Sequence, residues 1–313
     1  MISLLAKTGL QLVLLLLIAP VLSGIMKTLK ARLQTRRGPG MLQTYQDIFK
    51  LFRKGMVIPE TASWIFSATP YIVFGTAALV GLMIPMAATD APLSLFGGVL
   101  AIVYLLALGR FFLALGGLDA GSSFGGLGSS REMTISAIAE PAMMLAIFTV
   151  ALAANSTNLS EMANVAVSQS WKFLAPSQML AFAALFIVLI AETGRIPVDN
   201  PATHLELTMI HEAMILEYSG PYLALIEYGA SLKQLVLMTL VVNTFFPFGL
   251  SSHWTVQGLS LGLLFYLIKM LVLSCLIVLI ETTNAKLRLF RVPELLMVSF
   301  IFGALALIST FLF

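Results

Sequence analysis

The sequence has few charged residues and almost no cysteine, and each shortage excludes a class of protein. Only 11% of the 313 residues are Asp, Glu, Lys or Arg, whereas 59% are hydrophobic. A soluble domain carries roughly a quarter of its residues as charged side chains, so this chain lacks the charge for a surface that faces water. Cys275 is the single cysteine, which rules out a disulfide within the chain and leaves no thiolate set for iron–sulfur clusters or structural zinc. Any redox centre must belong to a partner protein.

Long apolar runs recur along the whole sequence. About twenty apolar residues are enough to cross the hydrocarbon layer of a membrane. The sequence therefore predicts an all-α fold: residues 1–313 form a single transmembrane helical domain, a polytopic membrane protein with about eight transmembrane helices. The predicted spans are Leu10–Met26, Pro70–Ala88, Leu93–Leu115, Ile135–Ala154, Ser177–Ala191, Ala224–Phe248, Leu259–Ile280 and Leu295–Phe313.

The basic residues orient the predicted bundle. The first, third, fifth and seventh loops hold nearly all the loop Lys and Arg residues, and the even-numbered loops offer Lys172 alone. Cytoplasmic loops are enriched in Lys and Arg, so the odd-numbered loops are predicted to be cytoplasmic and both termini to lie outside. We expect Leu10–Met26 to stay in the chain as a span, because no small-x-small signal-cleavage site follows it.

Three connecting segments have patterns of their own. Apolar residues recur at helical spacing in Gln43–Lys54, which predicts an amphipathic helix lying in the membrane interface. Gly116–Ser130 is rich in Gly and Ser and is predicted to be a flexible loop. It ends in Ser129-x-x-Glu132, a capping box that would begin the fourth span. A second capping box, Thr203-x-x-Glu206, predicts a short helix in the fifth loop from His204 to about Glu217.

Ionisable residues stand in or at the end of the apolar runs, where they are costly and usually face the bundle interior or a hydrated cavity. They are Arg110, Glu140, Glu192, Glu227, Lys269 and Glu281. Structural pairing is the favoured interpretation for Arg110 and Lys269. For the carboxylates, desolvation raises pKa values, so two alternatives stay open: a proton relay through intervening water, and satisfied ion pairs that hold the loops.

Other functions find less support in the sequence. His204 and His211, seven residues apart, are a weak metal signal, and His211-Glu212 is not followed by the second histidine of a metalloprotease. No convincing internal repeat favours a secondary transporter. The basic first loop could bind anionic lipid or a partner protein. Nucleic acid is an improbable partner because the basic residues lie close to the predicted membrane.

Two stretches resemble the subunit-1 family of respiratory complex I. The first is Arg32-x-x-x-Arg36-Arg37-Gly38-Pro39-Gly40, followed by Gln43, Asp47 and Lys50. The second is the order Glu192, Arg195, Pro197, Asp199, Glu206 and then Glu217-Tyr218-Ser219-Gly220. The branch found in membrane-bound energy-converting nickel–iron hydrogenases, including formate hydrogenlyase, is favoured by Gly117-Leu118-Asp119-Ala-Gly121-Ser122, Ser129-Ser130-Arg131-Glu132 and Ser231-Leu232-Lys233-Gln234.

The resemblance implies a non-catalytic membrane-arm subunit that docks a hydrophilic hydrogenase module and couples its electron transfer to proton or sodium translocation. Candidate residues of the proton path are Glu140, Glu192, Glu206, Glu212, Glu217 and His204. Arg195 and Asp199 would shape the fifth loop. Candidate docking residues are Arg36, Arg37, Asp47, Lys50, Asp119, Arg131 and Glu132. No metal ligand and no cofactor is expected in this chain.

The implied partners supply the redox chemistry. A hydrogenase large subunit with the nickel–iron centre and an iron–sulfur small subunit would sit on the cytoplasmic face, with antiporter-like subunits alongside in a prokaryotic inner membrane. Two alternatives remain: a complex I subunit beside the quinone site, and a passive membrane anchor for which carboxylate-to-amide changes would be silent.

Overall fold

The computed structural model is built of helices, and it describes residues 2–168, 175–200, 209–251 and 254–312. Seven helices within these ranges are long and apolar enough to cross a membrane. They are α1 (Ile2–Leu33), α3 (Trp64–Met83), α4 (Val99–Asp119), α5 (Ser123–Ala154), α9 (Gly220–Phe245), α10 (Val256–Thr283) and α11 (Val292–Leu312).

The prediction of an all-α polytopic membrane protein is confirmed. The helix that matches the fifth predicted span, α7 (Pro176–Glu192), has 17 residues, the short end of the length that can cross the hydrocarbon layer. With α7, the described residues contain eight apolar helices that match the eight predicted spans. Three helices and two 3-10 turns complete the described elements: α2 (Gln43–Phe52), α6 (Leu159–Ser168), α8 (His211–Ile215), η1 (Ser94–Phe96) and η3 (Leu289–Arg291).

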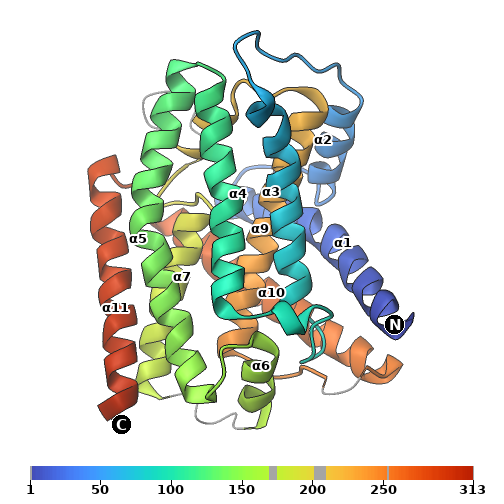
Figure 1. Cartoon of the computed structure of the whole chain (residues 1–313), viewed down its shortest axis with the longest axis vertical. Helices are drawn as coiled ribbons and strands as arrows, with labels where there is room; N and C mark the ends of the chain where they lie inside the picture. Colours follow the sequence, from blue (N-terminus) through green and yellow to red (C-terminus); the bar gives the residue numbers. More distant parts are fainter. Residues whose placement is uncertain (1, 169–174, 201–208, 252–253, 313) are drawn as a thin grey trace.

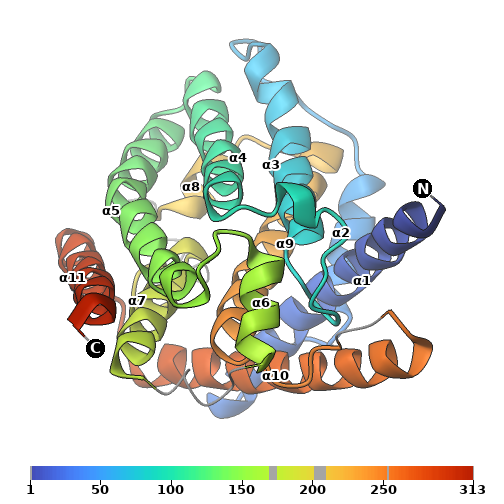
Figure 2. The ribbon, with the colours of Figure 1, turned by 60° about the horizontal axis from the view of Figure 1, so that its bottom comes forward.

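The spans do not run parallel to one another. In Figure 1, α3, α4 and α5 stand upright, with α2 near their upper end and α6 near their lower end. Both chain ends lie in the lower half of the same view. Figure 2 shows α10 crossing one side of the bundle at a steep angle to the upright helices. The chain ends therefore share one side of the protein, opposite the basic first loop that carries α2.

The helix predicted over Gln43–Lys54 is present as α2 and ends at Phe52. It is amphipathic: Thr44 and Ile48 are buried, whereas Phe49 is exposed. The hydroxyl of Tyr45 donates to the carbonyl oxygens of Leu16, at 3.1 Å, and Leu17, at 2.5 Å, which ties α2 to α1. Burial raises the pKa of Tyr45 above its ordinary value, so this hydroxyl stays a donor at physiological pH.

The predicted flexible loop over Gly116–Ser130 was wrong. α4 continues to Asp119, and α5 begins at Ser123, capped by the Ser122 hydroxyl that accepts from the Gly125 amide at 3.3 Å. Ser129 lies inside α5 and donates to the Ala114 carbonyl at 2.8 Å, so it opens no helix. The glycines serve close helix packing, since a Cβ on Gly125 would lie 2.2 Å from the Gly117 carbonyl oxygen.

The predicted helix from His204 to Glu217 also needs correction. Residues 201–208 lie outside the described part of the chain, and the helix that is described, α8, covers only His211–Ile215. Ile210 adopts φ −116° and ψ −78° and its amide donates to Asp199 Oδ2 at 3.2 Å. This tertiary bond bends the chain directly before α8, which a local capping pattern does not reveal.

A charged cavity within the bundle

A cavity of about 640 Å³ lies among the spans, between α1, α4, α7 and α9. It reaches from exposed Arg36 and Arg37 in the first loop to buried Arg110, halfway along α4, and Glu192, the last residue of α7. Its ionisable lining residues are Lys27, Lys30, Arg36, Arg37, Arg110, Glu132, Glu192, Arg195, Asp199, His211, Glu212, Glu227, Lys233 and Glu281. Charges in the membrane segments thus converge on one polar space.

The first charge cluster in this cavity is centred on Arg110. Its Nη1 lies 2.5 Å from Glu192 Oε1 and 2.9 Å from the Ser136 hydroxyl, and its Nη2 lies 3.2 Å from Glu140 Oε1. Lys233 of α9 approaches the other oxygen of Glu192 at 2.9 Å. The side chains of Arg110 and Glu192 are only 3% and 2% exposed. Two cations therefore hold one fully buried carboxylate, which meets the requirement that buried charges be paired.

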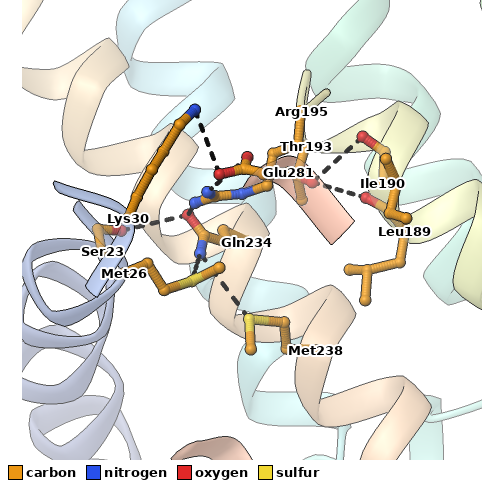
Figure 3. A network of polar contacts seen from close by, with 10 residues as sticks. All are labelled: Ser23, Met26, Lys30, Leu189, Ile190, Thr193, Arg195, Gln234, Met238 and Glu281. Carbon is orange, nitrogen blue, oxygen red and sulfur yellow. Dashed lines mark hydrogen bonds and ion pairs between the residues drawn. The ribbon is translucent and has the colours of Figure 1, made fainter. Parts of the chain in front are cut away.

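The second cluster is centred on Glu281, near the end of α10. Figure 3 shows its carboxylate between Lys30 of α1, at 3.3 Å, and Arg195 of the fifth loop, at 3.1 Å. Arg195 also donates from Nη2 to the side-chain oxygen of Gln234 at 2.9 Å, an oxygen that the Ser23 hydroxyl reaches at 3.3 Å. Lys233 and Gln234 are neighbours on α9, so this helix joins the two clusters.

Other carboxylates face the cavity in a different way. Glu132 of α5 and Glu227 of α9 line it and form no ion pair with a residue in the described ranges. Glu212 of α8 lines it as well. A cavity of this size has room for several waters, which could hydrate these acids.

The structure separates the predicted proton-path residues into three groups. Glu192 and Glu212 line the cavity, and Glu140 reaches the same Arg110 from α5. Glu217 is exposed, two residues after the end of α8, and is absent from the lining. His204 and Glu206 lie outside the described residues. Structural pairing of Arg110 agrees with the sequence interpretation, and Lys269 is likewise bonded, to Asn243 Oδ1 and the Phe246 carbonyl, each at 3.0 Å.

The residues predicted to shape the fifth loop bond to distant segments. Arg195 reaches Glu281 and Gln234, as described above. Asp199 is buried and accepts from Lys286 Nζ at 2.7 Å and from the amides of Asn200 and Ile210. The fifth loop is therefore fastened to α10 and to the loop that follows it.

The predicted docking residues fall into exposed and internal sets. Arg36, Arg37, Asp47 and Lys50 are exposed, as a docking role requires. Asp119 instead accepts from the amides of Ser63, at 2.7 Å, and Phe66, at 3.1 Å, at the start of α3. Negative charge there satisfies amides that the helix leaves free.

Arg131 and Glu132, also predicted to dock a partner, point inward. Arg131 donates from Nη1 to the Met209 carbonyl at 2.8 Å, and Glu132 lines the cavity. These two residues therefore act within the subunit in this structure.

The Glu217–Gly220 stretch joins the fifth loop to the first. The Ser219 hydroxyl accepts from the Val57 amide at 2.9 Å and donates to its carbonyl at 3.1 Å. Gly220 has φ +54°, and a Cβ on it would lie 2.7 Å from the Gly55 carbonyl oxygen, so only glycine fits. Tyr218 stacks on Phe66 with ring centroids 4.0 Å apart, and burial raises the pKa of its hydroxyl.

Sequence reasoning left out several residues that the fold brings into the site. Lys30, Lys233, Gln234 and Glu281 complete the two clusters, yet none was a candidate site residue. The sequence feature that could have identified them is a charged residue within an apolar run. This feature singled out Glu281, but it does not show which residues pair with Glu281. In the part of the chain that the structure describes, no group of three or more His, Cys, Asp or Glu side chains could hold a metal ion.

Comparisons with known proteins place this geometry in context. A family model described as NADH dehydrogenase matches residues 6–312. Formate hydrogenlyase subunit 4 of Escherichia coli (strain K12) is 36% identical over 299 residues, covering 96% of each chain. Hydrogenase-4 component C of the same organism is 36% identical over 297 residues, covering 95% of this chain and 92% of its own. A subunit of the NADH-quinone oxidoreductase of Syntrophobacter fumaroxidans (strain DSM 10017 / MPOB) is 33% identical over 262 residues and covers 77% of this chain and 76% of its own.

A solved structure has the same fold. A chain of the membrane-bound sulfane sulfur reductase, an archaeal respiratory membrane complex, superposes with a TM-score of 0.86 and covers 98% of this chain and 99% of its own. Its sequence identity is 18%, so this likeness concerns the fold alone.

Proposed function

This chain belongs to the NADH dehydrogenase family, the subunit-1 family that its sequence resembles, and on that premise we propose that it is the membrane-arm subunit of a redox-driven, ion-pumping hydrogenase complex. It docks the hydrophilic hydrogenase module and couples that module's electron transfer to translocation of protons or sodium ions. The names of the two relatives at 36% identity support the hydrogenase assignment.

One observation carries the coupling role: a charged cavity that connects the exposed basic loop to carboxylates deep in the bundle. Arg36 and Arg37 stand at its surface end, and Glu192 and Arg110 at its buried end. A lipid anchor has no need of buried charges, which are costly inside a membrane. Charge that changes in a module docked at Arg36 and Arg37 would act on the two clusters across the cavity, because buried charges are screened much less than exposed ones.

The proposed assembly follows from this position. A hydrogenase large subunit with the nickel–iron centre and an iron–sulfur small subunit would cover the exposed basic loop and α2. Antiporter-like subunits would pack against the spans in a prokaryotic inner membrane. The odd-numbered loops would be cytoplasmic and both termini outside, because of the enrichment of Lys and Arg in those loops.

The test uses the whole complex in proteoliposomes, with hydrogen turnover and ion uptake measured together. Glu227→Gln removes a cavity carboxylate that pairs with no described cation, so folding should be kept. We expect fewer ions moved per hydrogen turned over, with the complex still assembled. Glu192→Gln should act in the same direction but also weaken the Arg110 cluster. Glu294→Gln, at an exposed carboxylate in the first turn of α11 outside the cavity, is the matched control and should leave the ratio unchanged. If both cavity variants pump normally, the coupling role is wrong and the subunit serves only as a membrane anchor.

A second candidate is a complex I subunit that lines a quinone site. It is favoured by the 33% identity with a subunit of an NADH-quinone oxidoreductase and by a cavity volume within the usual range for small-molecule sites. Quinone reduction by the purified complex, with co-purified quinone and no hydrogen evolution, would select this candidate over the hydrogenase role.

A further inference from the structure

The half of the bundle toward the chain ends, here called the outer half, holds a second set of polar side chains outside the charged cavity. Thr239 of α9 and Tyr266 of α10 share a hydrogen bond of 2.7 Å between their hydroxyl groups. Thr239 is 2% exposed and Tyr266 is 0% exposed. Thr239 also donates to the Leu235 carbonyl at 2.7 Å. A buried hydroxyl pair of this kind, in an apolar surrounding, calls for an explanation beyond packing.

A second polar group lies one helical turn further along α9. The amide nitrogen of Asn243 donates to the Pro85 carbonyl, at 2.7 Å, and to the Met86 carbonyl, at 3.2 Å, and its oxygen accepts from Lys269. Lys269 is half-buried and also donates to the Phe246 carbonyl at the end of α9. This group leads to the end of the bundle where both chain ends lie.

A small cavity separates the two groups. Its volume is about 10 Å³, and both Thr239 and Asn243 line it, together with Thr244 and Pro85. This is about the volume that one buried water requires, and a buried water also needs two to four polar partners. The Thr239 hydroxyl, the Asn243 side chain and the second lone pair of the Pro85 carbonyl can supply them. A water bound here would join the hydroxyl pair to Asn243.

A layer of methionine closes the other end of this outer path. Figure 3 shows the Gln234 amide pointing down at the sulfur atoms of Met26, at 2.7 Å, and Met238, at 3.8 Å. Gln234 is the innermost α9 residue of the charged cavity, and Thr239 lies five residues further along the helix, about 7.5 Å along its axis. A thioether has no proton to donate, so the charged cavity and the outer path are disconnected in this structure.

We propose that Thr239, Tyr266, Asn243 and one bound water form the outward half of a proton path within this subunit, gated from the charged cavity by Met26 and Met238. This inference rests on the proposed coupling function and assigns the ion as a proton. A pump must never open both sides at once, and a methionine layer one helical turn thick provides that separation. Met238 has three rotatable side-chain bonds, so a rotamer change can admit water between Gln234 and the Thr239–Tyr266 hydroxyl pair.

The proton balance is simple because no group ends ionised. A proton that reaches the Tyr266 oxygen from the opened gate stays there, while the proton previously on that oxygen moves to Thr239. The Thr239 proton moves in turn to the bound water. That water releases a proton toward the outer surface beside Lys269, and each hydroxyl then rotates back to its starting orientation.

The first experiment measures passive proton leak across proteoliposomes that hold the whole complex without electron donor. Met238→Ala removes the thioether from the gate, so the leak should rise several-fold above wild type. Met238→Leu keeps the volume of the side chain and should not leak. Tyr266→Phe added to Met238→Ala should return the leak to the wild-type rate. A leak that Tyr266→Phe leaves unchanged, a leak that carries sodium instead of protons, or no leak at all overturns the proposal.

The second experiment separates this proposal from the proposed function. Tyr266→Phe and Thr239→Val should each lower the number of protons pumped per hydrogen while hydrogen turnover persists. Ser274→Ala is the matched control, because the Ser274 hydroxyl is equally buried on α10 and bonds only to the Met270 carbonyl. If the Glu227→Gln variant loses coupling and the Tyr266→Phe variant pumps normally, the function stands and the outer path is wrong.

Discussion

The inner and outer halves of this bundle place polar groups in the membrane in two different ways. The inner half gathers full charges, held in pairs around Glu192 and Glu281, beside a cavity of about 640 Å³. The outer half uses neutral hydroxyl and amide groups, one half-buried lysine and a space of about 10 Å³. Charges need either partners or bulk water, whereas neutral hydroxyls are satisfied by one neighbour each. The difference therefore follows from how much water each half can hold.

The largest effect is expected in the inner half, from Arg110→Gln. This change leaves Glu192 with Lys233 alone and removes the ion pair with Glu140. Breaking a buried ion pair by removing one partner costs about 3–5 kcal/mol. The amount of assembled complex in the membrane and its thermal stability in detergent should both fall sharply. Adding Glu192→Gln should restore part of the stability, because the most buried carboxylate of the cluster is then neutral. Wild-type stability of the single variant would show that the cluster is solvated.

An intermediate effect is expected in the outer half, from Asn243→Ala. The change leaves the Pro85 and Met86 carbonyls and one donor of Lys269 without their partner. Leaving buried polar groups unsatisfied costs roughly 1–3 kcal/mol. The midpoint temperature of thermal inactivation should fall, and by less than it falls in Arg110→Gln. Thr244→Ala, at the adjacent position of α9, is a suitable control. A fall in the midpoint as large as that of Arg110→Gln would show that the neutral polar groups of the outer half contribute as much stability as the ion pairs of the inner half.

The smallest effect is expected from Ser274→Ala on α10. Its hydroxyl bonds to the carbonyl of Met270 in the same helix, at 2.7 Å. Such a bond to the residue four positions earlier adds little to helix stability, so we expect a change below about 0.5 kcal/mol. Thermal inactivation and ion coupling should match wild type. A large loss would mean that buried hydroxyls on α10 matter for packing, and the effect of Tyr266→Phe would then need a packing control as well.

The sequence predicted long elements better than short ones. Apolar runs fix where helices can cross a membrane, and α2 followed from helical spacing of apolar residues. The Gly- and Ser-rich stretch before Arg131 was misread as a loop, because glycine serves both turns and close helix packing. In the fifth loop, the described helix α8 begins at His211, directly after Ile210 bonds to Asp199, and a local sequence pattern does not reveal this tertiary contact.

The candidate site was predicted in part. Glu192 was identified because ionisable residues in apolar runs are rare, and Arg195 and Asp199 were identified because they belong to the stretch that resembles the family. Their partners Lys30, Lys233 and Glu281 come from three other helices. A single sequence records which residues are charged, and it does not record which of them meet.

The sequence by itself determined that this chain is a membrane protein of the subunit-1 family, since hydropathy, loop charge and the motif residues are local properties. Only the tertiary structure decided that the charges form two clusters on one cavity and that Gln234, at the end of this cavity, points at the sulfur atoms of Met26 and Met238. The physical reason is that pairing depends on distances of a few ångströms between helices far apart in the chain, and packing alone sets those distances.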